Sequence, residues 1–117
     1  MHLMKVNEIY YNLLKSSKKT IELRLYDEKR KNIKIGDIIE FSNTSDVNDK
    51  FMAKVTNIYH ADNFIELCKN IDCTKAGFST DSELINVLES FYSSGLQKVY
   101  GVVGIEIQIH YTNDTLD

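Results

Sequence analysis

The segment from Lys18 to Arg24 holds the densest set of chemically capable side chains in the sequence. It reads Lys-Lys-Thr-Ile-Glu-Leu-Arg, with strict alternation of polar and apolar residues from Thr20 onward. Alternate side chains of a strand point to the same side, so Thr20, Glu22 and Arg24 should share one face. A hydroxyl, a carboxylate and a guanidinium, with Lys18 and Lys19 at their entry, could bind phosphate groups and base edges.

The net charge conceals an asymmetry along the chain. The 117 residues include 14 Lys and Arg against 17 Asp and Glu, a net charge of −3. Residues 1–35 contain nine bases and four acids, a net of +5, whereas the other 82 contain five bases and 13 acids, a net of −8. The N-terminal third is therefore where an anionic partner is expected. Lys15 and the run Lys29-Arg30-Lys31 would add to this field, although such a run is also typical of an ordinary solvated surface.

Several kinds of site lack the residues that they require. Two cysteines, Cys68 and Cys73, and three isolated histidines predict neither a zinc site nor a disulfide framework. The five glycines form no phosphate-binding loop. No apolar run approaches the ~20 residues of a membrane span, and no signal peptide is recognisable. We expect a reduced, cytoplasmic protein with no metal, no cofactor and no membrane contact.

The hydrophobic pattern predicts the helices that would position these residues. They are expected at 8–16 with Asn7 as N-cap, at 62–69, and from the capping box Thr80-Asp81-Ser82-Glu83 to a stop near Gly95. Their apolar stripes, which include Ile9, Ile65 and Phe91, should face the core.

Strands are expected at 19–25, 38–41, 51–59 and 99–111, with charged or polar loops at 27–34 and 42–49. Long strands separated by loops and short helices favour an α+β domain with a curved sheet or small barrel. We expect one domain over 1–117, with its core at about 3–111, and a last strand bent at Gly101 and Gly104.

Three motifs, in this order, resemble the ASCH domain family, which is related to PUA domains. Lys18–Arg24 resembles the family segment G-K-K-T-I-E-x-R, and Gly36–Phe41 resembles G-D-x-I-x-F. Phe91-Tyr92-Ser93 followed by Lys98–Ile107 resembles the family's ending. The resemblance runs from about Leu3 to Ile109, and Ser17 stands where many relatives have glycine.

This resemblance implies a PUA-like small β-barrel with flanking helices, and RNA or a nucleotide-like ligand in a cleft beside the Lys18–Arg24 strand. The candidate ligand-binding residues are Lys18, Lys19, Thr20, Glu22 and Arg24, with Tyr92, Ser93 and Tyr100 on the other wall. Lys19 and Arg24 would hold phosphates. Glu22 would orient Arg24 or accept a hydrogen bond from a base amino group, and a tyrosine ring would stack on an unpaired base. The alternatives are a structural Glu22–Arg24 ion pair and tyrosines that only pack.

Two other functions stay open. Some ASCH-like proteins act as ribonucleases or as amidohydrolases on acylated cytidines, where a lysine activates a hydroxyl three residues later. Here Lys19 is followed at that spacing by Glu22, which cannot replace a threonine nucleophile. A Lys19–Glu22 acid–base pair could serve metal-independent hydrolysis if the cleft lowered the lysine pKa and raised the glutamate pKa. The third possibility is a protein-interaction module that uses the acidic remainder of the surface.

Overall fold

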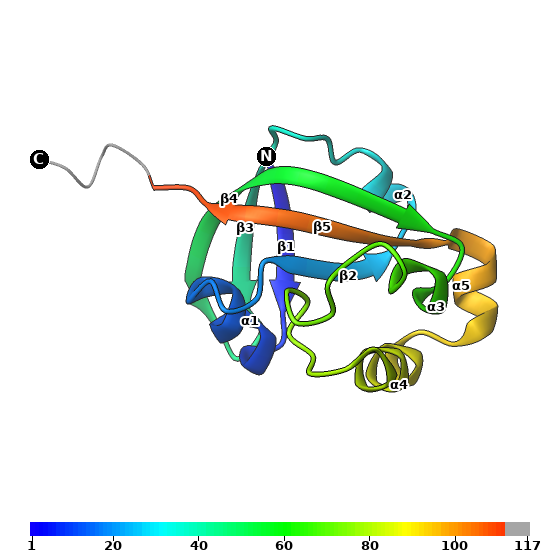
Figure 1. The fold of residues 1–117 in the computed structure, drawn as a ribbon. Helices are drawn as coiled ribbons and strands as arrows, with labels where there is room; N and C mark the ends of the chain where they lie inside the picture. Colours follow the sequence, from blue (N-terminus) through cyan, green and yellow to red (C-terminus); the bar gives the residue numbers. More distant parts are fainter. Residues whose placement is uncertain (112–117) are drawn as a thin grey trace, which may run out of the picture.

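Residues 1–111 fold into one curled sheet whose outside is flanked by helices (Figure 1). The computed structural model describes these residues, so 112–117 of the expected 1–117 domain lie outside the described part. The elements in chain order are β1 His2–Val6, α1 Glu8–Lys15, β2 Ile21–Leu25, α2 Glu28–Lys31, β3 Ile38–Asn43, β4 Asp46–Ala61, α3 Phe64–Leu67, α4 Asp81–Phe91, α5 Ser94–Tyr100 and β5 Val102–Ile109.

The strand order β1-β3-β4-β5-β2 places β1 and β2 at the two ends of the sheet. β1 runs parallel to β3, and the other neighbouring strands are antiparallel. The sheet curls into a half-barrel, which brings β2 across from β1 (Figure 1). The α+β class and the PUA-like barrel architecture are therefore confirmed.

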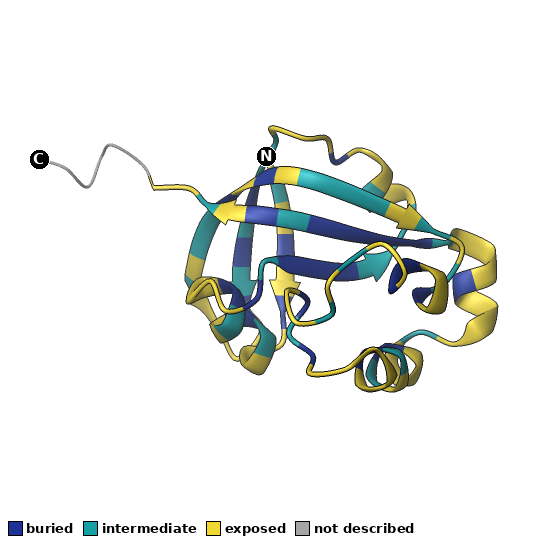
Figure 2. Ribbon diagram, viewed as in Figure 1, coloured by how far each residue is buried: buried dark blue, intermediate teal, exposed yellow. Residues whose placement is uncertain are grey.

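Both faces of the sheet are buried near β2 and β5, the darkest strands of Figure 2. Ile105 and Ile107 of β5 belong to the cluster inside the barrel, whereas Ile21 and Leu23 of β2 pack against the helices. Gly104 makes this close packing possible, because a Cβ at this position would lie 3.2 Å from Cγ2 of Ile21. The burial of both faces is what encloses the polar side chains of β2.

Local sequence rules account for two of the helix starts. The Asn7 side chain accepts a hydrogen bond from the backbone nitrogen of Ile9 and begins α1. Thr80 accepts one from the backbone nitrogen of Glu83 and begins α4, as the capping box predicts. No helix among residues 1–111 is long and apolar enough to cross a membrane.

Several boundaries differ from the sequence-based expectation. β1 was not predicted, and the charged stretch 27–34 contains the short helix α2, which Asp27 caps. Gly95 lies within α5 instead of ending α4, and that helix also takes up Val99 and Tyr100, which were expected in the last strand. Gly101, at φ 72°, ends α5, so it terminates a helix and does not bend a strand.

The predicted apolar stripes are only partly buried. Ile9 is 70% exposed, Ile65 49% and Phe91 58%, whereas Tyr11 and Leu67 are fully buried in their place. In α1 the buried side chains are Tyr11 and Leu14, whereas in α4 the predicted Leu84 and Leu88 are buried and, of that stripe, only Phe91, the last residue of the helix, is exposed.

Ser17 has φ 63°, the left-handed region that favours glycine. We predict that Ser17→Gly raises the free energy of unfolding by about 1 kcal/mol, because glycine removes the steric cost of this conformation. Urea denaturation measures the change. Gly77→Ala is the opposite control, since Gly77 has φ 92° and its new Cβ would lie 3.3 Å from Cδ of Lys19. A Ser17→Gly protein less stable than the parent would contradict the prediction.

Candidate functional site

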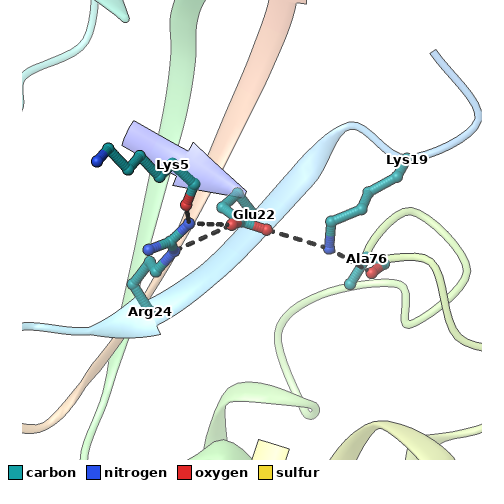
Figure 3. A network of polar contacts seen from close by, with 5 residues as sticks. All are labelled: Lys5, Lys19, Glu22, Arg24 and Ala76. Atoms are coloured by element: carbon teal, nitrogen blue, oxygen red, sulfur yellow. Dashed lines mark hydrogen bonds and ion pairs between the residues drawn. The ribbon is translucent and has the colours of Figure 1, made fainter. Parts of the chain in front are cut away.

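Lys19, Glu22 and Arg24 form one buried chain of polar contacts (Figure 3). Arg24 donates to Oε2 of Glu22 from Nε at 3.0 Å and from Nη2 at 2.8 Å. The Lys19 Nζ lies 3.5 Å from Oε1 of Glu22 and donates to the backbone oxygen of Ala76 at 2.6 Å. Lys19 is 2% exposed and Glu22 6%, so these charges are compensated inside the fold.

The segment that follows α3 covers Lys19. The backbone nitrogens of Thr20 and Ile21 both donate to the backbone oxygen of Lys75, at 2.8 and 3.0 Å. Gly77 passes beside the Lys19 stem, where a Cβ would be 3.3 Å from Cδ. The lysine is therefore held between β2 and this segment, with its ammonium directed along the strand toward Glu22.

Arg24 also joins the two ends of the sheet. Its Nη2 donates to the backbone oxygen of Lys5 on β1 at 2.7 Å, while the same guanidinium holds Glu22 on β2 (Figure 3). We call this meeting of β1 and β2 the seam. The Glu22–Arg24 ion pair thus contributes to the fold, because it closes the half-barrel at this point.

The environment acts differently on the two buried titratable groups. Burial lowers the pKa of Lys19, and the Glu22 charge opposes this effect. Burial alone would raise the pKa of Glu22, but the charges of Lys19 and Arg24 outweigh it and hold this pKa below its usual value. Glu22 is therefore a carboxylate near neutral pH. The lowered pKa of Lys19 agrees with the hydrolysis hypothesis. That hypothesis also required a raised pKa for Glu22, and this prediction is wrong because the Glu22 pKa is lowered.

Lys19 and Glu22 line a small cavity of about 50 Å³, which we call the aromatic cavity. Its other walls are Tyr10, Leu23, Phe78, Leu88, Phe91 and Tyr92. The Lys19 Nζ lies 5.5 Å from the ring centre of Tyr10 and 5.8 Å from that of Phe78, within the range of cation–π attraction. A charged pair and several aromatic rings thus meet around one small hollow.

The structure brings together part of the residue set expected from the sequence. Lys19, Glu22 and Tyr92 line the aromatic cavity, and Arg24 adjoins it through Glu22. Thr20 is only half buried, and its backbone is paired with Lys75 and Ile107.

The remaining candidates lie elsewhere or serve the fold. Lys18 is exposed, and Lys15 is 2.8 Å from Asp49 in an ion pair. The Ser93 hydroxyl caps α5 by accepting from the nitrogen of Leu96. Tyr100 lines a different cavity, of about 570 Å³, between α3 and α5. The structure therefore does not place Ser93 and Tyr100 on the wall opposite Lys19.

Four residues at or near the site were not among the candidate binding residues expected from the sequence: Lys5, Tyr10, Phe78 and Phe91. The helical spacing of Tyr10 and Phe91 indicated core positions, and Phe78 carries no pattern of its own. Lys5 reaches the seam only because β1 pairs with β3, and no local signal predicts that pairing. Within residues 1–111 no three His, Cys, Asp or Glu side chains are grouped to hold a metal ion.

Comparisons with known proteins agree with this architecture. The model of the ASCH domain matches residues 4–110. The crystal structure of the hypothetical protein PH0355 is 37% identical with a TM-score of 0.80, over 92% of this chain and 97% of that one. The solution structure of protein PF0455 from Pyrococcus furiosus is 34% identical with a TM-score of 0.71, over 95% and 98%.

A more distant structure, the ASCH protein from Zymomonas mobilis, is 13% identical with a TM-score of 0.66 and shows a shared fold. The match covers 91% of this chain and 65% of the Zymomonas chain. No curated protein matched the sequence. The family match spans nearly all of the described residues and includes the three motifs: the chain belongs to the ASCH domain family.

Proposed function

We propose that this chain binds RNA, or a nucleotide-like ligand with the same chemical groups, beside the Lys19–Glu22–Arg24 network. One observation carries the proposal: a buried carboxylate–cation network opens on a cavity lined with aromatic rings. Aromatic rings stack on unpaired bases, and a carboxylate accepts hydrogen bonds from base amino groups. Family membership supports the same class of ligand, since the resemblance to ASCH domains implies RNA.

The aromatic cavity is too small for a base and would have to widen to bind one. About 50 Å³ is room for one or two water molecules, and a base needs more. Phe91 forms part of the wall at the end of α4 and is 58% exposed, so it can turn outward at little cost in buried area. The base would then stack against Tyr92 with its polar edge toward Glu22. Only an unpaired base can enter in this way, which favours single-stranded RNA.

The two tyrosines that the sequence could not separate give the test. We predict that Tyr92→Ala weakens binding of a labelled single-stranded RNA about tenfold, because one base loses its stacking partner. Tyr100→Ala, the matched control beside the other cavity, should bind as the parent does. Fluorescence anisotropy measures the affinity, and circular dichroism checks that both variants are folded. Equal effects of both variants, or no binding of single-stranded or structured RNA by the parent, would reject the proposal.

The network also makes stability depend on pH. The pKa of Glu22 is lower in the folded state than in the unfolded state, so its contribution is complete above about pH 4.3 and is lost as pH falls through the folded-state pKa. We predict that Glu22→Gln costs about 3 kcal/mol at pH 7, because it leaves Lys19 and Arg24 without their shared counter-charge.

The difference between parent and Glu22→Gln should shrink as the pH is lowered below 4.3, since the parent glutamate then becomes neutral as well. Urea denaturation from about pH 7 down to pH 3 measures it. Other carboxylates with lowered pKa values, such as Asp37 and Asp49, affect both proteins equally and cancel in the comparison. A difference that does not change with pH would show that the Glu22 charge is not stabilising.

Hydrolysis at the same site is the second candidate, favoured by the lowered pKa of Lys19. In this reaction the neutral amine would act as the base and Glu22 would hold the substrate. We predict that any turnover of RNA or of an N-acylcytidine rises with pH, with an apparent pKa below the ~10.4 of ordinary lysine. Lys19→Met should abolish it while keeping the apolar stem. No turnover of either substrate, followed by chromatography, would remove this candidate.

A further inference from the structure

A hollow larger than the aromatic cavity lies on the other side of Arg24, and we call it the basic groove. It has a volume of about 580 Å³ and lies between β1, β2, β3 and α2. Four cationic side chains line it: Lys5 from β1, Arg24 from β2, and Lys29 and Arg30 from α2. Glu40 is the one carboxylate among the lining residues within the described part of the chain. The cations of β1, β2 and α2 thus converge on one positively charged hollow.

The fold neutralises these charges poorly. Nη1 of Arg30 is 3.6 Å from Oδ1 of Asp27, and its Nε is buried with no hydrogen-bond partner among the described residues. Glu40 lies nearer to another cation, with Oε1 at 3.8 Å from Nζ of Lys50. Lys5 and Lys29 are exposed. Arg24 is paired with Glu22, and Arg30 only at longer range with Asp27, so Lys5 and Lys29 are the cations that most need an anion from solution.

The backbone of β1 adds to this character. β1 is an end strand that pairs with β3, and its residues His2–Lys5 line the groove. An edge strand presents N–H groups that its own sheet leaves unpaired, and such groups bind phosphate oxygens. The Lys5 carbonyl on this edge is already taken by Arg24 at 2.7 Å.

We propose that the basic groove binds the phosphate groups of the ligand whose base is held in the aromatic cavity. The identity of that ligand as RNA rests on the function proposed above, whereas the phosphate site rests on the groove itself. Arg24 belongs to both places, because it lines the groove and holds Glu22 at the wall of the cavity. A single RNA strand that crosses the seam would therefore have its phosphates on one side of Arg24 and an unpaired base on the other.

This assignment changes the reading of the Lys29-Arg30-Lys31 run and of Lys19. Lys29 and Arg30 face the groove, whereas Lys31 is 3.4 Å from Glu28 and lies over the ring of Tyr26 at 5.8 Å. Lys19 is 2% exposed and donates to Ala76, so we no longer expect it to hold the phosphate that the sequence assigned to it. The phosphate contacts fall instead to Lys5, Lys29 and Arg30.

The test compares two double variants that remove the same charge. Lys5→Gln/Lys29→Gln alters the groove, and Lys31→Gln/Lys34→Gln alters the same region outside it. Anisotropy with a labelled single-stranded RNA at several salt concentrations gives the affinity and its salt slope. Each phosphate contact to a single strand contributes about 0.7 to that slope, so the groove variant should lose about 1.4. Calorimetry with inorganic tripolyphosphate probes the groove without any base.

Selective weakening of both ligands by the groove variant supports the phosphate site. If the two variants weakened RNA binding equally, the effect would come from the general positive charge of the surface, and the site would be overturned. Unchanged RNA binding by the groove variant would also overturn it, while leaving the proposed function intact. Tripolyphosphate binding that needs the groove lysines, without any RNA binding, would support the phosphate site and reject RNA as the ligand. Failure of the parent to bind either probe would overturn the site.

Discussion

The curled sheet of this protein is closed at one point by a single guanidinium. β1 and β2 stand at opposite ends of the strand order, so no backbone ladder joins them within the described residues. Arg24 spans the seam by donating to the Lys5 carbonyl and to Glu22, and Lys19 supplies the second cation that the buried carboxylate needs. Burial of this network is tolerated because Glu22 is the counter-charge of both cations, and removal of Glu22 leaves Lys19 and Arg24 uncompensated.

The same contact separates two environments of different chemistry. On one side lies a small hollow with aromatic rings, a lysine whose pKa is lowered by burial and an ionised glutamate. On the other lies an open groove with four cations and one carboxylate. A nucleotide carries a flat ring and a phosphate, and these two environments match those two parts. The overall charge of −3 is compatible with such a ligand because the positive charge is concentrated at the groove.

The sequence predicted the features that depend on local rules: the Asn7 and Thr80 caps, the alternation of β2 and the α+β class. The sequence did not predict the features that depend on pairing between distant segments. β1 becomes a strand through its parallel partner β3, and Lys5 enters the site only as a result. Strand alternation placed Glu22 and Arg24 together, but it gave no sign that the covering segment at Ala76 would bury Lys19. Tyr92 and Tyr100 look alike in sequence, but Tyr92 is the C-cap of α4 and Tyr100 ends α5, a helix that was not predicted, and they line different cavities.

The central claim is that one ligand occupies both sides of Arg24. Nuclear magnetic resonance of the isotope-labelled protein, titrated with a short single-stranded RNA, tests it most directly. The account predicts that shifts appear together, with a single affinity, in β1 and α2 around the basic groove and in Phe78, Phe91 and Tyr92 around the aromatic cavity. Shifts confined to the cavity beside Tyr100, or two groups of shifts with different affinities, would contradict it.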